Sequence, residues 1–300
     1  MRSTGFWNAA DGTAVWYGLD GGDGPTVVLC DGLGCDGYVW PYIIDLLDER
    51  FTLVRWHYRG HGNSEEPQDL TGTITIEQFT HDLHGVLDHL GGGSEPLTPR
   101  RPVILVGHSM GCQIALEYTR HYPDEVAAMV LLCGAPGRVL DTFRDTDRFR
   151  NVLRPLLAAV DKAPALVNAL WRGVLSSPLG WVASRGEVNL KRIRRRDFMP
   201  YLQHMGNIRP EVFLRALADA AQHDATDVLP QVKAPTLVVA GALDNFTPVY
   251  LSERMAEQIP GAELLVFEDG THTAPLEHPA QLNEALQAFL QQHGFWSDAP

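Results

Sequence analysis

The sequence predicts an α/β fold in which a mostly parallel, twisted sheet is flanked by helices and interrupted by an all-helical insertion. Short runs rich in Val and Leu, bounded by Gly, Pro or Asp, have the length and composition of buried strands. Helical patterns separate these runs, which is typical of parallel strands joined by helical crossovers. The alternation stops over residues 137–225, where only helical patterns occur.

The predicted buried strands lie at residues 26–30, 52–56, 103–107, 127–134, 236–241 and 263–269. The main predicted helices of the core lie at residues 75–91, 113–122, 249–259 and 278–294. Near the N-terminus, the Asp-Gly pair at residues 11–12 marks the turn of an antiparallel hairpin, which we expect at the edge of the sheet.

The helical block divides the chain into a core domain, residues 1–136 and 226–300, and a helical cap, residues 137–225. A block inserted between two strands of a parallel sheet covers one end of that sheet. Ligands bind at the carboxyl ends of such strands, so we expect the cap to shape a pocket there.

Charge and composition argue against several classes of protein. The 300 residues carry a net charge of −13, from 24 basic and 37 acidic side chains, which disfavours a nucleic-acid or membrane-surface binder. No apolar run approaches the ~18 residues of a membrane span, and the N-terminus lacks a signal core. The four cysteines lack a disulfide spacing, and Cys35 and Cys112 are expected to pack rather than react. We expect a soluble, cytoplasmic protein.

Ser109 stands between two glycines in the stretch Gly-His-Ser-Met-Gly, residues 107–111. A predicted strand precedes it and a predicted helix follows, which is the context in which G-x-S-x-G forms a sharp turn that exposes a nucleophilic serine. The backbone of such a turn is strained and passes close to its neighbours, which leaves no room for a Cβ at either glycine. We therefore predict that Ser109 is a nucleophile rather than a structural serine.

A serine hydroxyl is a weak nucleophile unless a base takes its proton and a third group orients that base. Asp244 follows the next-to-last predicted strand, and His272 follows the last one. The chain order serine, aspartate, histidine is the order used with this type of turn. Ser109, Asp244 and His272 are therefore the predicted catalytic triad.

Acyl transfer places negative charge on the carbonyl oxygen of the substrate, which preorganised backbone N–H groups must stabilise. The residue after the nucleophile, Met110, is the first predicted donor of this oxyanion hole. The glycine-rich loop Asp-Gly-Leu-Gly at residues 31–34 follows an earlier strand, and its Leu33 is the second predicted donor.

Other histidines suggest alternative sites. His81, His84 and His89 lie on one predicted helix with acidic neighbours, a spacing that is compatible with metal ligands. We favour a polar helix face, because no further ligands cluster with them in the sequence, and we expect neither a metal nor another cofactor. His57 and His61, in a loop after a strand, are candidates for the rim of the site.

Together, these segments resemble the α/β-hydrolase superfamily over nearly the whole chain. The loop at residues 31–40 is similar to the family's H-G-x-x loop with its downstream Trp. Residues 57–67 are similar to its D-x-R-G-x-G-x-S-x-x-P segment, and the elbow, acid, histidine and cap segments resemble their counterparts. The resemblance implies the α/β-hydrolase fold and a Ser-His-Asp triad, and it leaves the substrate open.

Three residues depart from the family's pattern. Asp31 stands where relatives usually carry His, and we expect its carboxylate to turn away from the oxyanion and to bond loop amides. His57 stands in place of a frequent Asp, and Cys112 in place of a frequent Gly. The serine nucleophile makes dehalogenase or epoxide hydrolase activity unexpected, because those members use Asp. The pattern is similar to that of carboxylesterases, enol-lactonases, carbon–carbon bond hydrolases and cofactor-free perhydrolases.

The expected function is hydrolysis of a small-to-medium carboxylic ester or lactone through an acyl-enzyme on Ser109. The alternatives are a carbon–carbon bond hydrolase or a perhydrolase on the same triad, and more remotely a non-catalytic, ligand-binding member of the fold. The expected partner is a small-molecule substrate, and we expect the protein to bind neither nucleic acid nor a membrane; the oligomeric state stays open.

The basic cluster at residues 191–196 is expected to be a solvated helix face. The cap residues that either line an acyl pocket or form the core of the cap are Trp171, Trp181, Phe198, Tyr201 and Met205.

Overall fold

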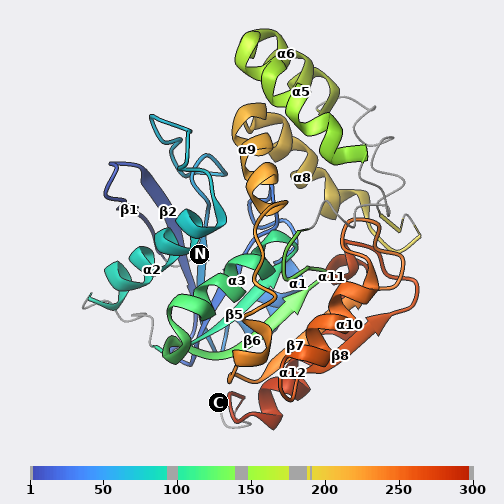
Figure 1. Ribbon diagram of the computed structural model, residues 1–300. Coiled ribbons are helices and arrows are strands. Elements are labelled where there is room, and N and C mark those ends of the chain that lie inside the picture. The colour runs from blue at the N-terminus through green and yellow to red at the C-terminus, as the bar shows by residue number, and fades with distance from the viewer. Residues whose placement is uncertain (1–2, 93–100, 139–147, 176–187, 190, 297–300) are drawn as a thin grey trace.

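An eight-stranded sheet forms the centre of the molecule (Figure 1). The computed structural model describes residues 3–92, 101–138, 148–175, 188–189 and 191–296. The strands are β1 (Ser3–Asn8), β2 (Ala14–Gly21), β3 (Thr26–Cys30), β4 (Thr52–Trp56), β5 (Val103–His108), β6 (Val126–Leu132), β7 (Thr236–Gly241) and β8 (Glu263–Phe267). Their spatial order is β1-β2-β4-β3-β5-β6-β7-β8, with antiparallel pairing only at β1-β2 and β2-β4. The predicted fold class is confirmed, and the expected hairpin lies at the edge of the sheet.

Helices cover both faces of this sheet. They include α1 (Pro41–Leu47), α2 (Ile76–Gly91), α3 (Met110–His121), α10 (Val249–Gln258), α11 (Ala274–Glu277) and α12 (Pro279–Gln292). In β5, Val103 and Leu105 pack into the apolar cluster that contains α2 and α3, whereas Ile104 and Val106 pack into the cluster that contains α1 and α12. This burial on both faces explains why the strand is a continuous apolar run.

Two boundaries differ from the sequence prediction where the backbone leaves regular geometry. β6 ends at Leu132 rather than at residue 134, and the next residue, Cys133, has a left-handed φ of 47°. The helix α3 begins at Met110 rather than at residue 113, because it starts directly after the turn that holds Ser109.

Between β6 and β7 the chain forms a group of helices at one end of the sheet (Figure 1). The helices described there are α5 (Arg148–Lys162), α6 (Pro164–Leu175), α8 (Arg195–Asn207) and α9 (Pro210–Ala220). The two ends of this insertion meet at a neck, residues 136–138 and 223–225. There Gly137 forms a β-bridge with Asp224, and the N–H of Ala225 donates to the Pro136 carbonyl over 2.9 Å. The chain therefore leaves the sheet and returns to it at a single place.

The cysteines are buried and unpaired: Cys30, Cys35, Cys112 and Cys133 are all free thiols. Burial raises the pKa of the Cys30 thiol to about 12 and that of the Cys112 thiol further. These thiols are therefore protonated at neutral pH and act as small apolar groups in the core. Within the described ranges, no helix combines the length and the apolar character needed to cross a bilayer.

Replacing Gly111 with Ala is expected to lower the free energy of unfolding by about 1–3 kcal/mol or more. A Cβ at this position would lie 2.0 Å from the backbone oxygen of Cys30, which cannot yield without moving β3. The matched control is Gly91→Ala, where an added Cβ meets nothing within 4 Å, and its stability is expected to be unchanged or raised. Urea unfolding of the two variants measures the difference, and equal stabilities would contradict the tight contact.

Candidate active site

The nucleophile candidate Ser109 lies at the turn between the central strand β5 and the helix α3. Its backbone is left-handed, with φ 54° and ψ −118°, a conformation that costs a non-glycine residue free energy. The Ser109 N–H donates to the Leu132 carbonyl over 3.0 Å, and its own carbonyl accepts from the Cys112 N–H. The flanking glycines allow the close passage, since a Cβ on Gly107 would lie 2.5 Å from the Gly111 oxygen.

His272 lies in the loop after β8 and joins Ser109 to Asp244. Its Nε2 is 2.9 Å from the Ser109 Oγ, and its Nδ1 is 2.8 Å from Oδ2 of Asp244. An imidazole with these two partners carries its proton on Nδ1 and presents Nε2 as the acceptor for the serine hydroxyl. The structure thus brings the three predicted triad residues into one hydrogen-bonded chain.

The carboxylate of Asp244 is held by the loop after β7. The N–H groups of Phe246 and Thr247 donate to its Oδ1 over 2.8 Å and 2.9 Å. The Thr247 hydroxyl lies 2.8 Å from Oδ2 and also 2.8 Å from the Cys133 carbonyl. These contacts fix the oxygen that faces His272, so the imidazole is oriented by a carboxylate that cannot rotate freely.

A second carboxylate, Glu277 in α11, fixes the loop that carries His272; the sequence analysis did not identify it. Its oxygens accept from the Thr271 N–H at 2.8 Å, from the Thr271 hydroxyl at 2.6 Å and from the Thr273 hydroxyl at 2.7 Å. The Asn189 N–H adds a fourth donor at 2.8 Å. The residues on both sides of His272 are thus bound to one buried group. Its only sequence signal is an acidic residue five positions after His272.

His108, directly before the nucleophile, supports His272 from its backbone side. Burial lowers the pKa of the His108 imidazole to about 3, so the ring is neutral near pH 7. Its Nε2 lies 3.0 Å from the carbonyl oxygen of His272, which requires the proton on Nε2. The buried ring therefore joins the turn at Ser109 to the backbone of His272.

The predicted oxyanion loop, residues 31–34, lies against Ser109. A Cβ on Gly32 would be only 3.2 Å from the Ser109 Cβ, so the chain before Leu33 passes directly beside the serine. Met110 is the first residue of α3, and the N–H groups of a first helical turn have no acceptor within their helix. The two predicted donors thus belong to segments that meet at Ser109.

The Asp31 side chain binds Trp40 in addition to a loop amide, whereas only loop amides were expected as its partners. The Trp40 Nε1–H donates to its Oδ1 over 2.6 Å, and the backbone of Gly37 also binds it. Only 4% of Asp31 is exposed, and this burial raises the pKa of its carboxyl to about 8. The two hydrogen bonds lower the pKa, but by less than burial raises it. The carboxyl is therefore predominantly neutral at pH 7, and it does not oppose a negative charge nearby.

The cap residues named from the sequence contact different parts of the molecule. Met205 contacts the predicted oxyanion loop, since a Cβ on Gly34 would lie 2.2 Å from its Sδ. Trp171 donates from Nε1 to the Met205 carbonyl over 2.7 Å. Phe198 and Tyr201 pack on the ring of Tyr38 in the core domain. Trp181 lies outside the described residues.

The other histidines named as candidates, His57 and His61, are both buried. His57 stacks on Trp16 with ring centroids 4.2 Å apart, and its Nδ1 accepts from the Asn63 N–H. Burial lowers the pKa of His57 to about 3 and that of His61 to about 4, so both rings are neutral near pH 7; His57 also lies close to Asp36 in the loop after β3 and to His204 in α8. In the basic cluster, residues 191–196, the Lys and Arg side chains are exposed as expected, but α8 begins at Arg195, so residues 191–194 precede the helix and the cluster is not a single helix face.

The sequence profile of the alpha/beta hydrolase fold family matches residues 25–279. The chain belongs to the α/β-hydrolase family. Pimeloyl-(acyl-carrier protein) methyl ester esterase of Chromobacterium violaceum is 27% identical over 270 residues, which cover 90% of this hydrolase and 96% of that protein.

Solved structures show the same fold. A thermophilic esterase from Thermogutta terrifontis has a TM-score of 0.75 at 23% identity, over 97% of this chain and 99% of its own. A bromoperoxidase from Bacillus anthracis has a TM-score of 0.76 at 22% identity, over 96% of this chain and 100% of its own. The fold is thus shared by proteins whose named activities differ, so the fold alone does not define the substrate.

Asp31→Asn is expected to become more stable relative to the parent protein as the pH rises. The folded-state pKa of about 8 lies above the ordinary value of 3.8, so the folded protein retains a proton that the unfolded chain loses. The parent protein therefore loses stability at up to about 1.4 kcal/mol per pH unit between these values, and the amide of the variant, which does not titrate, removes that slope. Urea unfolding at pH 5 and pH 8 measures the difference between the two proteins, and a pH-independent difference would show that the carboxyl is already ionised.

Glu277→Gln is expected to lower the free energy of unfolding by about 1–3 kcal/mol, because an amide NH2 group then faces buried donors. The matched control is Glu284→Gln on α12, an exposed carboxylate whose replacement is expected to have little effect. Urea unfolding compares the two. Equal stabilities would mean that the four donors to Glu277 contribute nothing to the fold.

Proposed function

We propose that this protein is a serine hydrolase that cleaves a small-to-medium carboxylic ester or lactone. The observation that carries the proposal is the hydrogen-bonded chain in which His272 lies 2.9 Å from the Ser109 Oγ and 2.8 Å from Asp244. A base at this distance from a serine, and itself oriented by a carboxylate, is the arrangement that activates a hydroxyl for attack on a carbonyl carbon.

In the first half-reaction, the Ser109 Oγ attacks the carbonyl carbon and its proton passes to Nε2 of His272. Asp244 stabilises the resulting imidazolium through the proton on Nδ1. The tetrahedral intermediate then expels the alcohol, which takes the proton from Nε2, and an acyl-enzyme ester on Ser109 remains. In the second half-reaction, water gives a proton to Nε2 and attacks the ester carbonyl, and the acid leaves as the serine regains its proton.

The oxyanion is assigned to the backbone N–H groups of Leu33 and Met110. Support comes from the contact between Gly32 and Ser109 and from the position of Met110 at the start of α3. A neutral Asp31 removes a charge that would otherwise repel the developing oxyanion. Backbone donors fixed in this way would need little reorganisation to stabilise the charge.

An ester substrate is favoured by the esterases among the relatives. The carbon–carbon bond hydrolase and the perhydrolase stay as alternatives on the same triad, and a binding protein without catalysis is the most remote one. We assign the acyl pocket to the region where the cap, residues 137–225, meets the oxyanion loop, because Met205 contacts Gly34 there. The cytoplasmic location stays a prediction.

Ser109→Ala is expected to lower the turnover of p-nitrophenyl esters by several orders of magnitude, because the acyl-enzyme cannot form. Ser252→Ala is the matched control, because it removes a buried hydroxyl from α10 outside this group. A fluorophosphonate is expected to label the parent protein and Ser252→Ala but not Ser109→Ala.

A panel of esters, lactones and thioesters of graded chain length, run on the same three proteins, identifies the bond class. Ester turnover that survives in Ser109→Ala would rule out the mechanism. Labelling of Ser109 without turnover of any ester, lactone or thioester would instead favour the carbon–carbon bond hydrolase or the perhydrolase. Absence of labelling would favour a binding role.

A further inference from the structure

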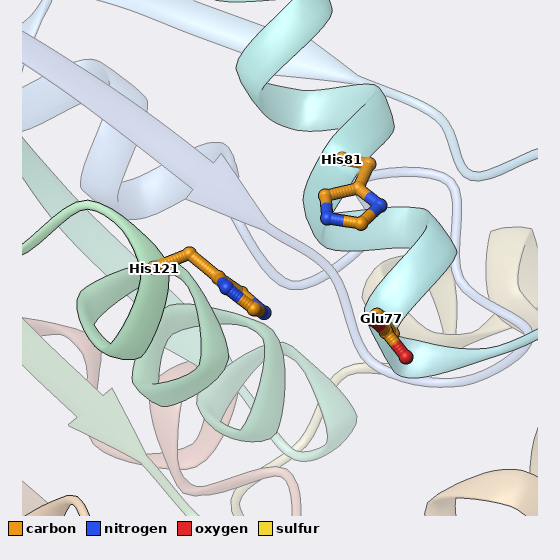
Figure 2. Close-up of side chains that lie close together, drawn as sticks. All are labelled: Glu77, His81 and His121. Atoms are coloured by element: carbon orange, nitrogen blue, oxygen red, sulfur yellow. The ribbon is translucent and has the colours of Figure 1, made fainter.

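Three potential metal ligands meet on the surface between α2 and α3. Figure 2 shows His121 extending from α3 toward α2, where Glu77 and His81 lie. Each residue offers one ligand atom, and these three atoms lie within 4.8 Å of one another. All three side chains are exposed, so an ion can reach them from solvent.

The helix geometry explains why the three side chains converge. Glu77 and His81 are four residues apart in α2, so they project from the same face of that helix on successive turns. α3 packs beside α2 and ends at His121, which brings its imidazole ring to 5.5 Å from that of His81, measured between centroids. The other histidines of α2 do not join the group: His84 stacks on Tyr122, and His89 contacts Tyr17.

The charges around the group favour a cation. Glu117 places an oxygen 3.2 Å from Nε2 of His121, so a second carboxylate borders the three ligands. Glu117 is itself largely buried and is held by His223 at 2.8 Å and by Arg120 at 3.1 Å. The Arg120 guanidinium faces this carboxylate and Asp227, where its charge is balanced by two acidic side chains.

We propose that Glu77, His81 and His121 bind a divalent transition-metal ion, with Zn²⁺ as the best match to the donors. Two imidazole nitrogens and one carboxylate oxygen are typical zinc ligands, whereas Mg²⁺ and Ca²⁺ take oxygen ligands. Zinc binds such atoms at about 2.0–2.2 Å, so these exposed side chains need only small rotations to close around the ion. Three protein ligands leave the fourth position of a tetrahedral site to water.

The ion would act on stability rather than on catalysis. α3 has 12 residues, which corresponds to a length of about 18 Å, and Ser109 precedes its first residue whereas His121 is its last. A metal at His121 is therefore remote from the triad, and its effect is to tie α2 to α3. An ion that binds the folded protein and not the unfolded chain raises the melting temperature. The polar helix face expected for His81 becomes, on this proposal, half of an interhelical metal site.

The test uses the full chain without an affinity tag, treated with EDTA and dialysed. Titration with ZnCl2 by calorimetry is expected to show one bound ion and a raised Tm, and MgCl2 is expected to give neither. Glu77→Gln, His81→Ala and His121→Ala are each expected to weaken zinc binding at least about tenfold and to abolish the rise in Tm. His89→Ala, which removes an exposed histidine of the same helix, is the matched control and is expected to bind zinc as the parent does.

Absence of stoichiometric zinc binding would overturn the proposal, and so would equal affinity in the parent and the three ligand variants. Loss of binding in His89→Ala would also count against it, because the ion would then lie elsewhere on α2. Ester hydrolysis without added zinc is expected to be the same in all five proteins. The outcome for zinc is therefore independent of the outcome for Ser109.

Discussion

The left-handed backbone of Ser109 is the constraint on which the rest of the site depends. A serine at φ 54° is tolerated only because β5 is buried on both faces and because the Ser109 N–H is bonded to the neighbouring strand. The turn also requires contact distances that only glycine allows at positions 107 and 111. The other groups of the site contact this turn or its neighbours: the loop at residues 31–34 lies beside Ser109, His272 bonds to its hydroxyl, and His108 bonds to the His272 carbonyl.

Three buried carboxyl groups around Ser109 and His272, those of Asp31, Asp244 and Glu277, have different hydrogen-bonding environments. Asp244 and Glu277 each accept hydrogen bonds from backbone N–H and hydroxyl groups, which stabilise an anion in a region with little water. Asp31 receives fewer bonds, so desolvation dominates and keeps its proton in place to about pH 8. Asp244 thus orients His272, Glu277 holds the loop around His272, and Asp31 binds Trp40 as a neutral carboxyl group.

The sequence predicts the sheet, most helices and the spacing of the triad because each follows from a local pattern. Buried strands read as apolar runs, and Asp244 and His272 come directly after two of them. Glu277 was missed because its importance comes from four donors that converge only in the folded chain. The stacking of His57 on Trp16 is not indicated by the sequence for a related reason, since nothing in the loop of His57 points to that partner. The ligands at Glu77 and His121 lie on two helices, so no spacing within one segment reveals them.

The neck at residues 136–138 and 223–225 makes the structure of the insertion independent of the strand pairing in the sheet. Because the chain leaves and returns through adjacent residues, the length of the insertion does not affect the register between β6 and β7. Two side chains of α3 nevertheless hold the returning segment: Gln113 donates to the Ala220 carbonyl over 2.9 Å, and Glu117 binds His223. A foreign segment grafted between these ends would leave the pairing of β6 with β7 unchanged, but it would lose the contacts of α3 unless Ala220 and His223 were kept.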